Sequence, residues 1–251
     1  MHLRPRPRYM LRLVLLVPLL VMLSCGRTPP RVAGPYRTPL AQYRYSCQPL
    51  DSLAVAAVLP ELEQRFGRQL EADAYRDKIL AALSFYPELR GVPIRLVRKQ
   101  LRTSMAARPR GLLTRRRSRR GYTIYADDVS HDKPADFRKA SYAAQVGCFI
   151  HELGHISYYV NRSKLQLLGD GLAYVTNQQF KNGYERIADR MAIRNGGGYY
   201  VYLYRTFTFE EAELPEAYLA FKRRNYTDNR RLLKLHLDYL REHSVEKCLE
   251  H

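Results

Sequence analysis

Tryptophan is absent from this chain of 251 residues, and cysteine occurs only four times. No two cysteines form a C-x-x-C pair, which excludes a zinc site of the cysteine-rich kind. After residue 24 no apolar run is long enough to span a membrane, which excludes a polytopic membrane protein. Internal repeats are also lacking. The remaining composition, 46% hydrophobic and 26% charged, supports a packed core in one domain of ordinary size with appended segments.

Acidic residues are scarce, because 24 Asp and Glu stand against 42 Lys and Arg, for a net charge of +18. Such a chain attracts polyanions, and the candidates are nucleic acid, anionic lipid headgroups and cell-wall polymers. The basic residues are densest in the run Arg115-Arg116-Arg117-Ser118-Arg119-Arg120. A run of this charge density cannot be buried, so we expect a protruding loop or hairpin tip. It contacts an anionic lipid or polymer, or it is simply solvated.

The first 24 residues have a basic start followed by an apolar stretch that Pro18 interrupts. This pattern is typical of a signal peptide rather than of a spanning helix. The stretch ends in Met22-Leu23-Ser24-Cys25-Gly26, which resembles the lipobox of bacterial lipoproteins, with Met22 where Leu is usual. The resemblance implies that Cys25 is lipidated and that the protein is an exported, membrane-anchored lipoprotein of the bacterial cell envelope. Nucleic acid is therefore not an expected partner.

Three segments are expected along the chain. They are a signal peptide over 1–24, an anchor and proline-rich tether over 25–47, and a single domain over 48–251. Three cysteines remain once Cys25 is lipidated. Among the pairings that the sequence allows, a disulfide between Cys47 and Cys248 would join the two ends of the domain and leave Cys148 buried.

Periodicity along the domain predicts an α+β fold. Alternating, β-favouring residues predict strands over 94–101, 103–107 and Gly121–Ala126. A helical period predicts one long helix over 135–161. The other expected helices are 51–68, broken or kinked near Pro60, 71–85, all or part of 163–180, 181–195, and one or two over 216–240.

The long helix contains His151-Glu152-Leu153-Gly154-His155 between uncharged flanks. Residues four apart lie on one face of a helix, so His151 and His155 present two imidazoles to one point. Zinc accepts two such nitrogens and leaves room for a third ligand and a water. Glu152 follows the first histidine and can take a proton from that water. The alternative is a pair of buried histidines that bind no metal.

A third ligand must come from elsewhere in the chain. A metzincin would need Gly and His where this chain has Tyr158 and Asn161, so that class is excluded. The remaining candidates are the isolated His131 and His236, Asp170 between two glycines, and Glu185 on a predicted helix of its own.

Glu185 is the best of these candidates, because Asp189 follows it by one turn on the same helix face. A carboxylate at the first position completes a His₂Glu zinc site. The carboxylate one turn later can accept the free N–H of a ligand histidine. The alternatives are that Glu185 is an ordinary surface charge and that Asp189 pairs with a neighbouring arginine.

Together, His151-Glu152-Leu153-Gly154-His155 and Glu185-x-x-Ala188-Asp189-x-x-Ala192 resemble the gluzincin metallopeptidases. The likeness is to the minigluzincin pattern shared in part by HtpX-like, CaaX-processing and ImmA/IrrE-type proteins, and it covers roughly residues 90–200. It implies a zincin-like fold, with a small, mostly antiparallel sheet of about three to four strands packed on the active-site helix. HtpX-like enzymes have several membrane spans that this chain lacks.

The resemblance implies zinc-dependent hydrolysis of peptide bonds, with zinc on His151, His155 and Glu185 and with Glu152 as the base. An extended peptide or protein substrate would pair with an edge strand, expected around Gly121–Ala126. The alternative is a catalytically silent zinc-binding lipoprotein that binds a polymer or a partner protein. Candidates for the residue that stabilises the oxyanion are Tyr158, Tyr159, Tyr184, Tyr199 and Arg194.

Overall fold

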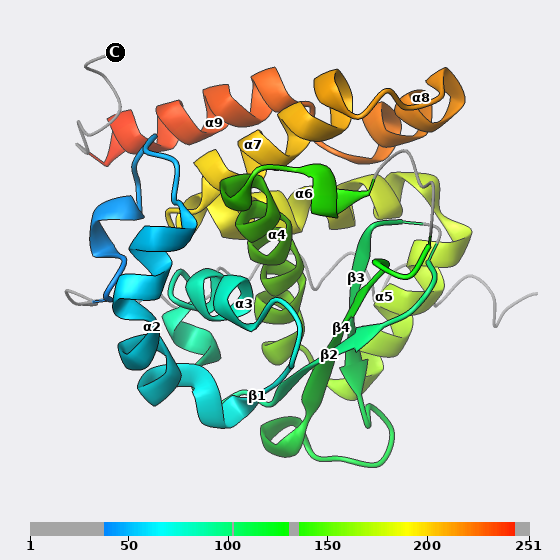
Figure 1. Cartoon of the computed structure of the whole chain (residues 1–251). Coiled ribbons are helices and arrows are strands. Elements are labelled where there is room, and N and C mark those ends of the chain that lie inside the picture. Colours follow the sequence, from blue (N-terminus) through cyan, green and yellow to red (C-terminus); the bar gives the residue numbers. More distant parts are fainter. Residues whose placement is uncertain (1–37, 102, 131–135, 244–251) are drawn as a thin grey trace, which may run out of the picture. The chain divides into compact units, whose positions relative to one another are not determined.

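Four strands form one small sheet in the order β1-β2-β4-β3 (Figure 1). The structure is a computed structural model, and it describes residues 38–101, 103–130 and 136–243. This part of the chain combines the sheet with helices before and after it, so the predicted α+β class is confirmed. The strands are β1 (Leu70–Glu71), β2 (Ile94–Arg98), β3 (Met105–Arg110) and β4 (Gly121–Ala126).

The prediction of a mostly antiparallel sheet is wrong. β1 pairs with β2 and β2 pairs with β4 in parallel, and only β3 and β4 are antiparallel. The reason is the order of the strands in space. β3 runs opposite to β2, and β4 runs opposite to β3 and so parallel to β2. β4 then lies between β2 and β3. Gly121–Ala126 is therefore a central strand and not the expected edge, and the two edge strands are β1 and β3. Pro109 suits the edge position of β3, because an edge strand tolerates a residue without an N–H.

Helices supply most of the fold. Helix α2 runs through Pro60 without a break. Because proline has no N–H, the carbonyl of Ala56 loses its partner within the helix. Both residues are exposed, so water can take the place of that partner. A π-helical turn (Phe207–Glu211) directly follows helix α7. The helices are α2 (Ser52–Phe66), α3 (Arg76–Leu83), α4 (Tyr142–Val160), α5 (Lys164–Thr176), α6 (Gln178–Arg194), α7 (Gly198–Thr206), α8 (Glu216–Asn225) and α9 (Asn229–Glu242).

Helix α4 is the element on which the others pack (Figure 1). It contacts α3, α6, α7 and β3, and nearly all of its side chains are buried. Its sequence explains this position, since α4 carries small and apolar side chains on all of its faces. Ser141 caps the helix by accepting a hydrogen bond from the amide of Ala144.

Residues 38–47, which were expected to belong to the tether, pack on the domain. Leu40 is buried, and the amide of Tyr45 donates to the carbonyl of Gly196 at 2.9 Å. Cys47 is disulfide-bonded, whereas Cys148 is a free, buried thiol as predicted. The expected partner Cys248 lies outside the described residues.

The signal peptide over 1–24, the lipidation site Cys25 and the tether up to residue 37 also lie outside the described residues. In the part of the chain that the structure describes, none of the helices has the length and hydropathy needed to cross a bilayer.

Candidate metal centre

Helices α4 and α6 bring His151, His155 and Glu185 together in the interior. The Oε2 atom of Glu185 lies 3.4 Å from Nε2 of His151 and 3.4 Å from Nε2 of His155. All three side chains are buried. The two helices approach this closely because Gly154 has no side chain: a Cβ there would lie 2.7 Å from the carbonyl oxygen of Ala188.

The three ligand atoms fit a metal ion. They all lie within 4.8 Å of one another. Ligands held about 2.0–2.1 Å from a tetrahedral ion are about 3.4 Å apart, and both contacts of Glu185 with the histidines have this length. Two imidazoles and a carboxylate also supply the nitrogen and oxygen atoms that divalent metals prefer. The buried cluster can therefore hold a metal ion.

Asp189 lies on the far side of His151, as the sequence predicted. Its Oδ1 atom is 2.9 Å from Nδ1 of His151 and 3.3 Å from Nη2 of Arg205. Burial acts to raise the pKa of Asp189, but the charge of Arg205 and the hydrogen bond with His151 outweigh it and hold the pKa below its usual range. Asp189 is therefore an ionised acceptor that fixes the ring of His151 with Nε2 turned towards Glu185.

The two carboxylates in contact with His151 favour the charged form of its ring. Burial favours the neutral ring, but the hydrogen bonds with Asp189 and Glu185 prevail and raise the pKa of His151 to about 9. A metal ion that binds here must therefore displace a proton, so its affinity falls at low pH.

Glu185 and His155 have partners of their own from the surrounding aromatic residues. The hydroxyl of Tyr174, on α5, donates to Oε1 of Glu185 at 2.9 Å. Burial would raise the pKa of Glu185, but its contacts with His151 and His155 hold it well below the usual range. The ring of Tyr184 stacks on His155 with centroids 4.9 Å apart.

Glu152 is buried beside this cluster, and its Oε2 atom has no hydrogen-bond partner in the described part of the chain. A buried carboxylate oxygen without a donor is unfavourable in a residue that serves only the fold. This free oxygen is available to a water or a substrate group at the cluster.

The other candidates for the third ligand are not part of the described cluster. Asp170 accepts a hydrogen bond from Tyr158 at 3.0 Å and takes no part in the cluster. His236 is buried on α9 against Gly198, and His131 lies outside the described residues. Among all the candidates, Glu185 is the one that joins the two histidines in the described chain.

The residues considered as stabilisers of the oxyanion lie in different surroundings. Tyr159 and Tyr184 contact each other through their hydroxyls beside His155. The hydroxyl of Tyr158 is turned to Asp170. Tyr199 contacts two other tyrosines of α7, Tyr200 edge-on and Tyr202 at a tilt, and Arg194 is exposed at the end of α6.

Three residues near the cluster had no sequence motif to reveal them. The ring of Tyr226 is 5.9 Å from that of His151, and it lies between the guanidinium of Arg205 at 4.5 Å and Nζ of Lys222 at 4.4 Å. Burial, with a smaller effect of Arg205, lowers the pKa of Lys222 to about 8. The only signal in the sequence was Arg205 itself, a charge inside an apolar, aromatic stretch.

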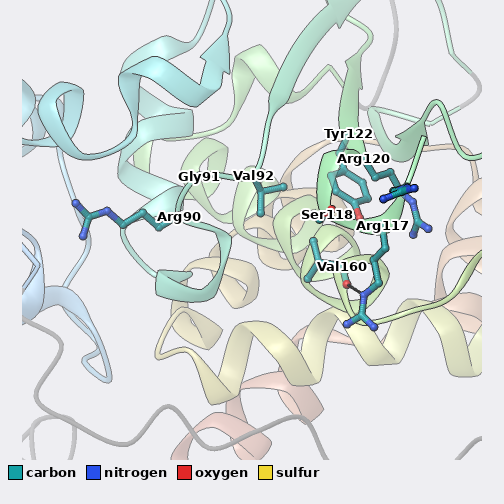
Figure 2. A pocket seen from close by; sticks show the side chains of 9 residues that line it. Arg90, Gly91, Val92, Arg117, Ser118, Arg120, Tyr122 and Val160 are labelled. Atoms are coloured by element: carbon teal, nitrogen blue, oxygen red, sulfur yellow. Dashed lines mark hydrogen bonds between the residues drawn. The ribbon is translucent and has the colours of Figure 1, made fainter. Parts of the chain in front are cut away.

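A cleft of about 600 Å³ lies apart from the cluster, at the C-terminal end of α4 (Figure 2). No acidic residue of the described ranges lines it. Arg120 is only 2% exposed, so the prediction that the whole arginine run avoids burial is wrong for this residue. Its Nη1 donates to the carbonyl of Arg162 at 3.1 Å, which explains why it turns inwards. The lining residues are Arg90, Gly91, Val92, Arg116, Arg117, Ser118, Arg120, Tyr122 and Val160.

None of the protein-family models matches the chain, and no curated protein and no solved structure matches it either.

Proposed function

We propose that the protein is a zinc-dependent peptidase that hydrolyses peptide bonds at the His151, His155 and Glu185 cluster. One observation carries the proposal. A buried His₂Glu set stands directly beside a buried glutamate that has an unpaired oxygen. A site that only binds metal has no need of that second carboxylate, whereas hydrolysis needs a base. The likeness of the motif to gluzincin peptidases supports the same conclusion.

His151, His155 and Glu185 would hold the ion, and Asp189 would keep His151 in the correct tautomer. A zinc ion, when bound, supplies Lewis-acid polarisation of the scissile carbonyl and acidifies a water molecule. Glu152 accepts the proton of the attacking water and then delivers it to the leaving amine. Burial of Glu152 and its free Oε2 atom suit this transfer.

Lys222 and Tyr226 are the donors that we assign to the developing oxyanion. Lys222 is 3% exposed and has no carboxylate within ion-pair distance in the described chain. Its Nζ atom is 4.4 Å from the ring of Tyr226, which in turn is 5.9 Å from the ring of His151, and the charges of Glu185 and Glu152 act on its pKa. A buried cation without a fixed counter-ion is well prepared to stabilise negative charge that forms only in the transition state.

The substrate would bind as an extended strand along β3. Its outer side pairs with no other strand of the described chain, and main-chain hydrogen bonds could form there. β3 also lies against α4, and Tyr159 on α4 donates to the carbonyl of Ala107. The expected export and the anchor at Cys25 would place this peptidase in the cell envelope.

The test is a comparison of native protein with Glu152→Gln and with Glu61→Gln, an exposed carboxylate on α2. Native protein should hold about one zinc ion and cleave members of an unbiased peptide library. Glu152→Gln should keep the zinc and lose cleavage, and Glu61→Gln should behave as native. Zinc retained by a native protein that cleaves no peptide would instead indicate a silent zinc-binding lipoprotein. Absence of bound metal would contradict both.

A further inference from the structure

Helix α5 has an apolar face that nothing in the described structure covers. The four large aliphatic residues on this face are 46–82% exposed and recur at helical spacing, so they form one stripe. The opposite face is occupied, since Leu167 is buried and Tyr174 reaches Glu185. Scattered exposed leucines are ordinary, but a continuous stripe marks an interaction surface. The stripe consists of Leu165, Leu168, Leu172 and Val175.

The arginine-rich loop lies next to the start of this helix. Lys164, the first residue of α5, donates from Nζ to the carbonyl of Leu113 at 2.9 Å, and Leu113 is itself 69% exposed. The loop is also attached to the segment that precedes α5, because Arg117 donates to the carbonyl of Val160 at 2.8 Å. The apolar stripe and the loop are therefore neighbours.

The loop carries positive charge that the protein does not neutralise. Four of its arginines are exposed, and none of them has an ion pair in the described chain. Arg120 is buried, yet its Nε and Nη2 atoms have no hydrogen-bond partner among the described residues. Because an unpaired buried cation is unfavourable, the cleft that Arg120 lines together with Arg116 and Arg117 is suited to an anion such as a phosphate (Figure 2). The exposed arginines are Arg115, Arg116, Arg117 and Arg119.

We propose that α5 and the 115–120 loop form a docking face for an anionic lipid bilayer. The aliphatic stripe and Leu113 would enter the boundary between headgroups and acyl chains, and the arginines would bind lipid phosphates, with one phosphate in the cleft beside Arg120. Apolar residues flanked by basic ones are the combination that binds such surfaces. A second copy of the chain fits less well, because a symmetric contact through this face would bring the same arginines together.

The absence of tryptophan makes this face testable in the full chain. Leu172→Trp introduces the only tryptophan of the molecule on the stripe, and Leu53→Trp introduces it on α2, where the native side chain is 79% exposed. Both variants share any lipid anchor, so a difference between them reports on the face alone. In vesicles that contain phosphatidylglycerol and brominated acyl chains, we expect the emission of Leu172→Trp to shift to the blue and to fall by at least about half. The emission of Leu53→Trp should change little.

The arginines are tested in the same assay. Replacing Arg115, Arg116 and Arg119 with Gln in the Leu172→Trp background should reduce the quenching several-fold. With vesicles of phosphatidylcholine alone, the quenching of Leu172→Trp should be reduced in the same way. Equal quenching at both tryptophans, or none at Leu172→Trp in a protein with native circular dichroism, would overturn the proposal. So would a blue shift that appears without lipid and rises with protein concentration, since a second copy would then cover the face.

Discussion

Asp189 and His151 are held together by a hydrogen bond of 2.9 Å between Oδ1 and Nδ1 in the interior of the protein. Arg205 contacts the same carboxylate oxygen and is itself buried. The three side chains come from three different helices, α6, α4 and α7. The orientation of a metal-ligating ring therefore depends on how these helices pack, and it can be altered without changing any ligand.

Replacing Asp189 with Asn should weaken metal binding roughly 10–100-fold, since the neutral amide no longer fixes the tautomer of His151. Competition with a chromophoric zinc chelator measures the affinity. Asp170→Asn is the matched control, because Asp170 bonds to Tyr158 away from the cluster and should leave the affinity unchanged. Equal affinities of the native protein and Asp189→Asn would show that Asp189 serves only the fold.

Gly154→Ala should separate α4 from α6, because the added Cβ would lie 2.7 Å from the carbonyl oxygen of Ala188. We expect the free energy of unfolding to fall by about 1–3 kcal/mol and the zinc affinity to fall with it. Gly183→Ala on α6 has open space around the new methyl group and should stabilise the protein by up to about 1 kcal/mol. Urea denaturation of the metal-free proteins distinguishes the two. We expect the free energy of unfolding to fall in Gly154→Ala and to rise in Gly183→Ala. A stable Gly154→Ala variant with native zinc affinity would contradict this expectation.

His236 should make the fold sensitive to mild acid. Burial lowers the pKa of His236 from 6.5 to about 4, with a smaller opposing effect of the backbone of Ser46. The unfolded chain therefore binds this proton at a higher pH than the folded protein does. The stabilisation is complete above pH 6.5 and is lost as the pH falls towards 4, by roughly 3 kcal/mol at most.

Urea unfolding of native protein and His236→Leu over this pH range measures the effect of that histidine. The stability of the native protein should fall more steeply than that of the variant, which has no proton to gain at this position. Parallel curves would show that His236 does not titrate in this way.

Lys222→Met should slow peptide cleavage by about 10²–10³-fold if the lysine stabilises the oxyanion. Its zinc content should not change, because Lys222 is not a ligand. The fold should be equally stable or more stable, since replacement of a buried charge by an apolar side chain of similar volume is often neutral or stabilising. Cleavage rate, zinc content and unfolding are measured on one preparation. Unchanged cleavage by a folded, zinc-loaded variant would remove Lys222 from the mechanism.

The sequence predicted those features that depend on short spacing. His151 and His155 are one helical turn apart, and the same holds for Glu185 and Asp189, so each pair shares a face whatever the fold. That the two faces meet followed from the family resemblance, and Gly154 is the physical reason. Strand β4 was predicted with its observed bounds, because its β-favouring residues are flanked by turn residues.

Features that depend on distant contacts could not be predicted in this way. The direction of β2 relative to β4 is set by the insertion of one strand between two others, which leaves no mark in local periodicity. Arg120 is buried because a carbonyl at the end of α4 accepts its hydrogen bond. Tyr226, which caps α8, lies beside His151, and Lys222 on α8 lies beside Tyr226, because α8 packs on α6; nothing in their neighbouring sequence indicates a site.

The central position of α4 has a consequence for the exchange of amide protons. Its amides are covered by helices on several sides and by β3, so they should exchange with deuterium only when the whole domain unfolds. His151 and His155 belong to that unit, whereas Tyr174 lies on α5, whose residues are mostly exposed or half-buried and which we expect to open more readily. The two histidines that would hold an ion therefore lie on the element that we expect to open last, whereas the tyrosine that contacts Glu185 lies on one that we expect to open earlier.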